Sequence, residues 1–481
     1  MAEVRPNKED FPNSGSVRKN TYYVAASQGV HLFLGFFLSW AAARMLGDAD
    51  FGKYNFAFAM SFLVYLLSDL GVVTYVTRET GRQRDLAARL FSNGAALKGL
   101  LLIFGALFLA GYLRLFSIAG DKLTAVLIFA VHGALYSFNQ LCIAVYRGFE
   151  RMEYEMRILI IEKAVITALG LFVLMRGWGL VPFALVFVIG AACSLILNLV
   201  WIRRTFIPHA IPVDWTFARR ILGASIFLGL FWIITNIHER VDVLMLEAMT
   251  EDRVLGWYSL AYRLFQVASV VPMVLMTSTF PRISRDSGQN DARVRQIFRV
   301  GMKYLFIVAL PMVVGTLFLS EKIVLFFGAD FRPAAPALKI LIMTAAVDFF
   351  SIFYAGFLLA WNRQRDLTLL QTGALILNVS VNLVLIPRLG HVGAATATLV
   401  SRGLIFAVCS VWIFRKTGGL ELKSMGLSIV AASLMGLLLY LWQGPLLLTI
   451  VVSGLAYGGI LYILGGIRPD EILIMRKQDP N

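Results

Sequence analysis

Eleven ionisable side chains lie inside long apolar runs of this sequence, and their chemistry is the most informative feature of the chain. A charge at the centre of a bilayer costs at least about 2.5–3.5 kcal/mol on insertion scales, so such a residue usually faces a partner or an aqueous cavity. The basic members are Lys98, Lys163, Arg240, Arg263, Lys339 and Arg402, and the acidic members are Asp69, Glu162, Glu239, Asp242 and Asp348. Arg44 lies near the end of another run.

The basic side chains are suited to binding an anion. Lys98, in FSNGAALKGLLLIF, stands roughly 15 Å along its helix at 1.5 Å per residue, too deep to reach the surface easily. Arg402, in ATLVSRGLIF, is placed similarly, and arginine binds phosphate through two hydrogen bonds at once. We predict a cationic substrate-binding cavity formed by Lys98, Arg263, Arg402, Arg44, Arg240 and Lys163. The alternative is internal pairing, of Lys98 with Glu162 and of Arg263 with Asp242 or Glu239.

The acidic side chains are candidates for ion coupling. Glu239 and Asp242, in HERVD, are three residues apart and share one helix face. They suit a cation site or a proton relay, or else a cluster neutralised by Arg240 or Arg263. Asp69 and Asp348 are isolated carboxylates, with ion coupling and hydrogen-bonded packing as the two alternatives.

The composition predicts a polytopic membrane protein. Of 481 residues, 58% are hydrophobic and 15% charged, with a mean hydropathy of +0.74, whereas soluble domains carry roughly a quarter charged residues. The net charge of +15 is spread over short clusters between apolar runs, which argues against a nucleic-acid partner. The three cysteines lie in apolar runs without metal-ligand spacing, so we expect neither a metal site nor a catalytic residue.

Fourteen apolar stretches are long enough to cross a membrane. They are 21–46, 52–77, 86–112, 122–147, 157–176, 180–202, 221–247, 255–280, 300–320, 333–361, 367–387, 392–414, 424–442 and 445–466. When both termini and every second loop are assigned to the cytoplasm, those segments hold 29 of the 44 Lys and Arg residues, against nine on the other side. We therefore expect a multi-pass protein of the cell membrane with cytoplasmic N- and C-termini.

An internal repeat organises the chain. RMLGDADFGKYNFA at 44–57 recurs 204 positions later as AMTEDRVLGWYSLA at 248–261, and both copies separate two apolar runs. We predict that each copy is an outer turn whose glycine, Gly52 or Gly256, allows a tight break. Tyr54 and Tyr258 are the corresponding outer-gate candidates.

The repeat predicts two six-helix bundles of the same orientation, followed by a helix pair. The expected divisions are a cytoplasmic tail 1–20, a bundle 21–203, a cytoplasmic linker 204–220, a bundle 221–415, helices 13 and 14 at 424–466 and a cytoplasmic tail 467–481.

Several ordered motifs carry a family resemblance over roughly 20–466. The first repeat with the "DLG" that follows it, LGWYSLAYRLFQ, LFFGADFRPAAPALKIL and NVSVNLVLIPRLGHVGAATATLVSR resemble polysaccharide flippases of the multidrug/oligosaccharidyl-lipid/polysaccharide exporter superfamily. The resemblance implies two bundles facing a central cavity. It also implies that an isoprenoid-pyrophosphate-linked sugar is exported by alternating access, as part of cell-surface polysaccharide biosynthesis.

Two related functions remain as alternatives: a flippase for a lipid II-type peptidoglycan precursor, and a cation-coupled multidrug antiporter. A membrane glycosyltransferase or ligase is disfavoured by the short outer loops. The sequence contains no nucleotide-binding GxxxxGK[ST] loop, so we expect no cofactor and a drive from a Na⁺ or H⁺ gradient or from the membrane potential. The expected partners are the lipid-linked glycan, membrane lipids and glycan polymerase or ligase proteins, with the chain itself a monomer.

Overall fold

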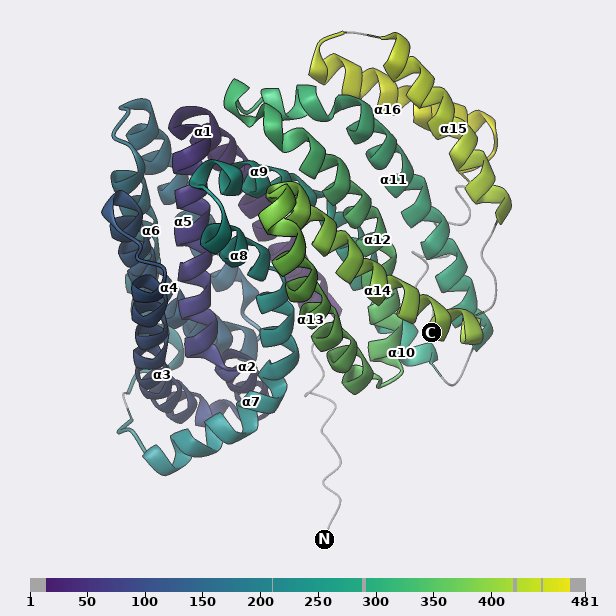
Figure 1. The fold of residues 1–481 in the computed structure, drawn as a ribbon. Coiled ribbons are helices and arrows are strands. Elements are labelled where there is room, and N and C mark those ends of the chain that lie inside the picture. Colours follow the sequence, from purple (N-terminus) through teal and green to yellow (C-terminus); the bar gives the residue numbers. More distant parts are fainter. Residues whose placement is uncertain (1–13, 210, 288–290, 418–421, 443, 468–481) are drawn as a thin grey trace. The chain divides into compact units, whose positions relative to one another are not determined.

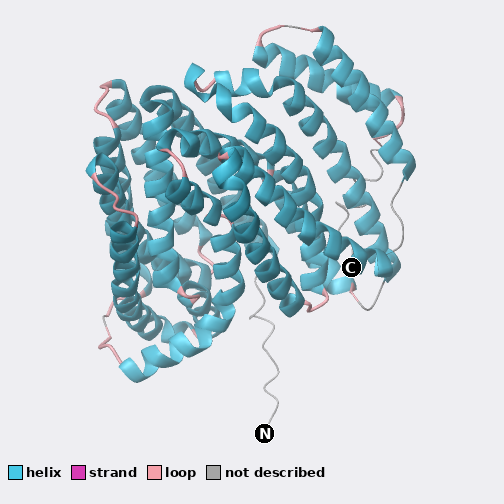
Figure 2. Cartoon of the chain, viewed as in Figure 1, coloured by secondary structure: helices cyan, strands magenta, loops and turns pink. Residues whose placement is uncertain are grey.

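The structure is a computed structural model that describes residues 14–209, 211–287, 291–417, 422–442 and 444–467. Within this part of the chain every regular element is a helix (Figure 2), which confirms the predicted all-α class. The predicted terminal tails lie largely outside the described residues. Contacts divide the chain into unit 1, Met1–Asn236, and unit 2, Ile237–Asn481.

Unit 1 is built around α1 and α4 (Figure 1). Its helices are α1 (Ser14–Asp69), α2 (Val72–Arg82), η2 (Arg84–Leu86), α3 (Ala87–Leu115), α4 (Gly120–Gly148), α5 (Met152–Met175), α6 (Leu180–Trp201), η3 (Ile202–Phe206) and most of α7 (Trp215–His238). α1 packs against α3, α4 and α5, and α4 also packs against α6. A Cβ atom at Gly133 would lie 2.3 Å from the carbonyl oxygen of Ser61, so the backbones of α4 and α1 touch.

α1 contains a break, and a second break separates it from α2. The first is at Gly47, with φ 77° and ψ 177°. It falls between the predicted spans 21–46 and 52–77, as expected, but the glycine that makes it is Gly47; Gly52 lies within the helix, so that part of the prediction is wrong. The second break is at Leu70 and Gly71, with φ 41° and 85°.

Unit 2 is built around α12. Its helices are the end of α7, α8 (Val241–Met249), α9 (Asp252–Ala268), α10 (Val270–Asp286), α11 (Asp291–Leu325), η4 (Ala329–Ala334), α12 (Ala335–Ala360), α13 (Gln364–Leu389), α14 (His391–Thr417), α15 (Leu422–Leu441) and α16 (Leu446–Ile463). α12 packs against α9, α10, α11 and α14, and α13 packs along α14. α15 and α16 pack on each other and on α11, where Tyr457 donates a hydrogen bond to the carbonyl of Ile307 at 2.8 Å.

The predicted span 221–247 is not one continuous helix. α7 ends at His238 and α8 starts at Val241, with Glu239 and Arg240 between them. A further break at Thr250 and Glu251 precedes α9, and the second predicted glycine of the repeat, Gly256, lies inside α9 and not at the break. The structure therefore places the turn of the second repeat five residues before Gly256, as it does for the first.

Eleven helices of the described chain are long and apolar enough to cross a membrane. The prediction of fourteen spans differs at three places. The first two predicted spans form one kinked run, 221–247 is divided, and α15 has a described apolar segment, Met425–Leu441, that is shorter than the length criterion. The chain is a multi-pass membrane protein.

α7 begins with a charged cap supplied by the linker. Asp214 accepts hydrogen bonds from the backbone N–H groups of Thr216 and Phe217, at 3.0 and 3.1 Å. Arg89 of α3 donates to the same carboxylate at 2.7 Å, and this bond, with the helix N–H groups, lowers the pKa of Asp214. Ile221 joins the hydrophobic cluster of α2, α3 and α4, so the first part of α7 packs with unit 1.

Candidate functional site

A buried ion pair lies at the centre of unit 1. The Lys98 ammonium on α3 is 2.7 Å from Asp69 Oδ1 at the end of α1, and the lysine side chain is 0% exposed. Lys98 also donates to Ser137 Oγ on α4 at 3.0 Å, and Ser68 donates to the same hydroxyl at 2.7 Å. The ring of Tyr65 lies 5.7 Å from the ammonium. Lys98 is thus neutralised within unit 1.

This arrangement corrects one prediction. The sequence suggested Glu162 as the pairing partner of Lys98, and the partner in the structure is Asp69. Glu162 is buried on α5. Asp69 therefore has a specific cationic partner, which an isolated carboxylate in the sequence does not indicate.

Further polar side chains lie between α1 and α4, beyond the Lys98–Asp69 pair. Ser61 Oγ is 2.7 Å from His132 Nδ1, and the rings of Tyr65 and Tyr136 meet edge to face with centroids 5.1 Å apart. Since Ser61, Tyr65 and Ser68 are spaced for one face of α1, the helices meet through a buried polar seam.

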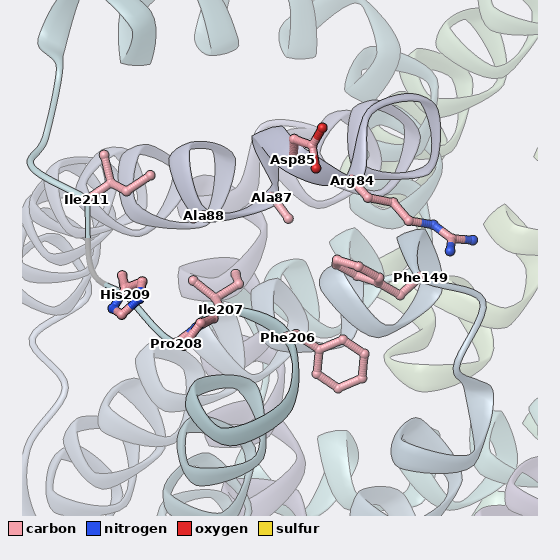
Figure 3. Close-up of a pocket in the computed structure, with 10 residues that line it drawn as sticks. All are labelled: Arg84, Asp85, Ala87, Ala88, Phe149, Phe206, Ile207, Pro208, His209 and Ile211. Carbon is pink, nitrogen blue, oxygen red and sulfur yellow. The ribbon is translucent and has the colours of Figure 1, made fainter.

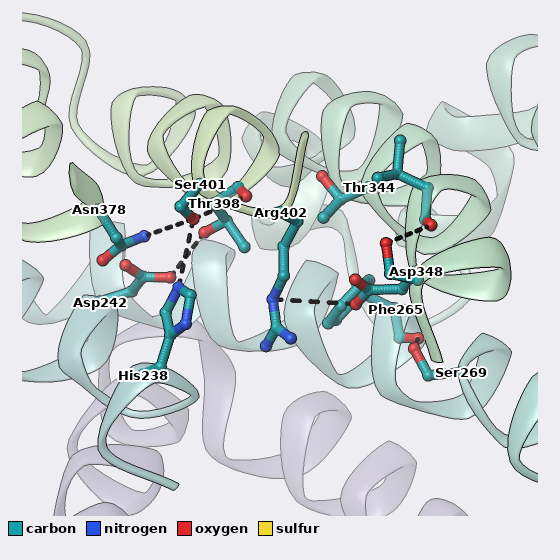
Figure 4. A network of polar contacts seen from close by, with 12 residues as sticks. His238, Asp242, Phe265, Ser269, Thr344, Asp348, Asn378, Thr398, Ser401 and Arg402 are labelled. Carbon is teal, nitrogen blue, oxygen red and sulfur yellow. Dashed lines mark hydrogen bonds and ion pairs between the residues drawn. The ribbon is translucent and has the colours of Figure 1, made fainter. Parts of the chain in front are cut away.

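A second polar centre, in unit 2, surrounds Asp242 on α8 (Figure 4). The carboxylate accepts hydrogen bonds from Tyr258 Oη, Asn382 Nδ2 and Thr398 Oγ1, each at 2.7 Å. The donors belong to α9, α13 and α14 and are all neutral groups. Asp242 is 2% exposed, so its charge sits among dipoles and not beside a cation in direct contact.

Further neutral groups extend this centre. Asn382 also donates to Asn378 Oδ1 at 2.9 Å, and Ser401 Oγ lies 3.2 Å from His238 Nε2. The Oδ1 atom of Asn382 is buried with no hydrogen-bond partner among the described residues. Carboxylate and amide oxygens are the kind of ligand that hard cations take in proteins.

Arg402 and Asp348 form a looser pair in the same unit. Arg402 Nε on α14 is 3.9 Å from Asp348 Oδ2 on α12, and their side chains are 12% and 6% exposed. Arg402 Nε has no hydrogen-bond partner in the part of the chain that the structure describes. In Figure 4 the guanidinium lies between the group formed by Asp242 and His238 on one side and Asp348 on the other. The arginine therefore keeps donor capacity that Asp348 does not use.

The other predicted cavity residues have different surroundings. Arg44 is exposed and lies 5.8 Å from the Trp40 ring, next to the Gly47 break. Arg240 is at the N-terminus of α8, Arg263 is half-buried on α9, Lys163 is half-buried on α5 and Glu239 lies in the break between α7 and α8. Lys98, Arg44 and Lys163 belong to unit 1, and Arg240, Arg263 and Arg402 to unit 2. Their common role in substrate binding stays a prediction.

The two gate candidates are core residues of their own units. Tyr54 is 8% exposed and its ring contacts those of Phe129, Phe183 and Phe187. Tyr258 is 0% exposed and donates to Asp242. Tyr54 therefore packs within an aromatic core, and Tyr258 is a hydrogen-bond donor to a buried carboxylate.

Unit 1 also has a cavity of about 350 Å³ that the sequence did not indicate (Figure 3). It lies between the start of α3, the α4–α5 turn and the segment after η3. Apolar side chains line its middle, including Phe149, Phe206 and Ile207, while Arg84 and His209 lie toward opposite ends of it in the view. The charged and titratable side chains that line it are Arg84, Asp85 and His209.

The sequence missed most members of the Asp242 centre. Asn378 and Asn382 are four residues apart on α13, and Thr398 and Ser401 are three apart on α14, so each pair shares a helix face. That spacing of neutral polar residues within apolar runs is the feature of the sequence that could have indicated the Asp242 centre. No group of three or more His, Cys, Asp or Glu side chains suited to a metal occurs among the described residues.

Comparison with solved structures identifies the class of fold. Over 92% of this chain and 98% of the other, the fold is similar to the lipid II flippase MurJ in an inward closed conformation, with a TM-score of 0.75 and 15% identity. It is also similar to an inward-facing multidrug resistance MATE family transporter of the MOP superfamily, with a TM-score of 0.65, 14% identity, and 81% and 96% of the two chains covered. The fold is that of MOP superfamily transporters.

The family follows from the sequence match. Residues 17–287 match the family model described as polysaccharide biosynthesis protein, and residues 228–384 match the one described as MatE. The chain belongs to the polysaccharide biosynthesis protein family. The suspected flippase family and the MOP fold are therefore confirmed.

Curated relatives match over part of their length. From Haloferax volcanii, the probable flippase AglR is 28% identical over 35% of this chain and 37% of its own. The probable low-salt glycan biosynthesis flippase Agl15 of that organism is 24% identical over 56% of each chain. A probable multidrug resistance protein NorM of Bradyrhizobium diazoefficiens is 29% identical over 36% and 40%. The chain thus spans about half, or less, of the curated relatives it matches.

Proposed function

We propose that this protein is a transporter, not an enzyme, that moves a polyprenyl-(pyro)phosphate-linked oligosaccharide from the cytoplasmic to the outer leaflet by alternating access. Its family and the two glycan flippases among its relatives support this class of substrate. Both termini are cytoplasmic in the proposal, because the Lys and Arg residues are concentrated on that side.

The observation that carries the proposal is the state of Arg402. Its guanidinium is buried in an apolar helix bundle, its nearest described carboxylate oxygen is 3.9 Å away, and its Nε is without a hydrogen-bond partner among the described residues. A phosphate oxygen is a strong acceptor that would complete this geometry and replace hydration lost on entering the membrane. The role assigned to Arg402 is therefore to bind the phosphate group of the lipid carrier.

The test is export of a lipid-linked oligosaccharide in cells that depend on this protein for it. Arg402→Ala should reduce export at least about tenfold, since one charge-assisted hydrogen bond is worth about 1.5–3 kcal/mol. The matched control is Arg388→Ala, at the exposed end of α13. Normal export by Arg402→Ala, at equal protein level, would refute the role of this arginine.

We also propose that Asp242 takes the coupling ion, Na⁺ or H⁺. For a sodium ion, the carboxylate, the Thr398 hydroxyl and the amide oxygens of Asn378 and Asn382 are oxygen ligands of the right kind. The ion would neutralise a buried carboxylate that contacts only neutral donors among the described residues. Substrate uptake into proteoliposomes, with either gradient imposed alone, distinguishes the two ions.

Two alternatives remain for the substrate. A lipid II-type carrier is suggested by the MurJ fold, and a drug cation by the NorM relative. Rescue of cells depleted of their own lipid II flippase would favour the first, and efflux of lipophilic cations the second. The basic side chain of Arg402 favours an anionic substrate, which either lipid carrier would be, over a drug cation.

A further inference from the structure

The carboxylate of Asp69 has a second task besides pairing with Lys98. Its Oδ1 accepts from the N–H of Val73 at 3.2 Å, and its Oδ2 accepts from the N–H of Gly71 at 3.3 Å. Asp69 therefore supplies the start of α2 with the acceptors that its first N–H groups require. One side chain links the ammonium of α3 to the backbone of the α1–α2 break.

That break has an unfavourable backbone shape. Leu70 has φ 41° and Gly71 has φ 85°, both in the left-handed region. A leucine adopts this conformation only where its surroundings enforce it. The hydrogen bonds that Gly71 and Val73 donate back across the turn to Asp69 hold the backbone in this conformation.

α7 fits directly onto the break. A Cβ atom at Gly71 would lie 2.4 Å from the carbonyl oxygen of Ser225, and one at Gly229 would lie 2.8 Å from the Gly71 nitrogen. The two backbones are therefore in contact, which both glycines make possible. A small change in the backbone of the break would therefore disrupt its contact with α7.

We propose that Lys98 and Asp69 are positioning residues for transport: the pair holds the α1–α2 break in the shape that seats α7. Lys98 acts through Asp69 and does not bind the cargo. This replaces the substrate-contact role that the sequence suggested for Lys98. The consequence for transport rests on the proposed function, since α7 continues along the chain into α8, which carries Asp242.

The first experiment is a double-mutant cycle on the full chain in lipid nanodiscs. It compares Lys98→Met, Asp69→Asn and the double variant by amide hydrogen exchange in the nanodiscs and by glycan export in cells that depend on this protein. Each single change leaves a buried group mismatched, so exchange over 70–76 and 222–230 should rise at least about tenfold while 446–463 is unchanged. In the double variant both charges are gone, and the amide oxygen of the introduced asparagine can still accept from the N–H of Val73, as Asp69 Oδ1 does, so both readouts should recover in part and exceed those of either single variant.

A substrate-binding lysine gives a different result. In that case the double variant exports as poorly as Lys98→Met, and exchange over 70–76 stays at the wild-type rate in both. This outcome would overturn the inference. If instead exchange follows the cycle but no form of the protein exports a glycan, the positioning role stands and the proposed function fails.

A second pair of variants covers the possibility that the single charge variants do not fold. Gly229→Ala places a methyl group against the Gly71 backbone, whereas Gly223→Ala, six residues earlier on α7, meets nothing within 4 Å. Exchange over 70–76 should rise in the first variant and not in the second, and export should fall in the first alone. Equal exchange and equal export in the two alanine variants would contradict the proposal that α7 depends on its contact with the α1–α2 break.

Discussion

The two units each bury an aspartate among hydroxyl groups, and the difference between these aspartates lies in their partners. Asp69 in unit 1 contacts an ammonium, and the pair is neutral, with the lysine side chain fully buried. Asp242 in unit 2 contacts Tyr258, Asn382 and Thr398, all neutral. A carboxylate with an internal counter-ion is suited to holding structure, whereas one surrounded by dipoles retains its attraction for an external cation.

The largest effect is expected from Asp242→Asn. If Asp242 takes the coupling ion, losing its formal charge should weaken ion binding by more than about 1.4 kcal/mol, which is more than tenfold. Uptake into proteoliposomes should then become independent of the ion gradient. The Lys98→Met/Asp69→Asn double variant is the matched control, and it should keep the gradient dependence of the wild type. If uptake by Asp242→Asn still depended on the ion gradient, the proposed difference in role between Asp69 and Asp242 would be wrong.

An intermediate effect separates the two ion pairs. Lys98→Met should destabilise the protein by about 3–5 kcal/mol, because it leaves the buried Asp69 carboxylate without its 2.7 Å partner. Arg402→Met removes a pair with a separation of 3.9 Å and should cost less. Thermal unfolding in one detergent measures both. We expect Lys98→Met to have the lower Tm. Arg402→Met should show the greater loss of export per unit of folded protein. A reversed order of Tm values would contradict the distinction between a structural and a ligand-binding cation.

The smallest effect is expected at the exposed pair of Arg89 and Asp214. Its hydrogen bonds lower the pKa of Asp214, so the pair stabilises the folded state above the pKa of the unfolded chain. The contribution disappears as the pH falls through the folded-state pKa. Asp214→Asn should therefore destabilise slightly at pH 7 and have no effect at low pH. A Tm difference that is the same at both pH values would show that the carboxylate charge is not involved.

The sequence identified most of the residues that matter and few of their contacts. Lys98, Asp69, Asp242 and Arg402 were all recognisable as charges within apolar runs. The pairing of Lys98 with Asp69 was not, because it depends on where α1 stops and on the angle of the following turn. The ion pair is buried because α1, α3 and α4 pack together around it. Hydrophobic periodicity shows which face of a helix is buried, but not against which other helix it packs.

The breaks show the same limit. Glycine marks the interruptions at Gly47 and Gly71. The first was placed by the gap between the apolar runs 21–46 and 52–77, although the glycine named for it, Gly52, was the wrong one. The break at Glu239 and Arg240 has neither glycine nor proline, so the apolar pattern of 221–247 predicted one continuous helix. Asn378, Asn382 and Thr398 were missed for a related reason: neutral polar side chains are ordinary in membrane helices, and only their convergence makes a site.

The closeness of Lys98 to Asp69 has a consequence for biogenesis. A lysine at the middle of a membrane helix costs about 2.5–3.5 kcal/mol on insertion, which the ribosome-bound chain must meet when α3 leaves the translocon. Synthesis delivers Asp69 29 residues earlier, so the counter-charge precedes the cation into the bilayer. α3 can thus enter the bilayer with its buried lysine already neutralised by α1, and a chain lacking Asp69 would show its defect during synthesis, before any cargo is encountered.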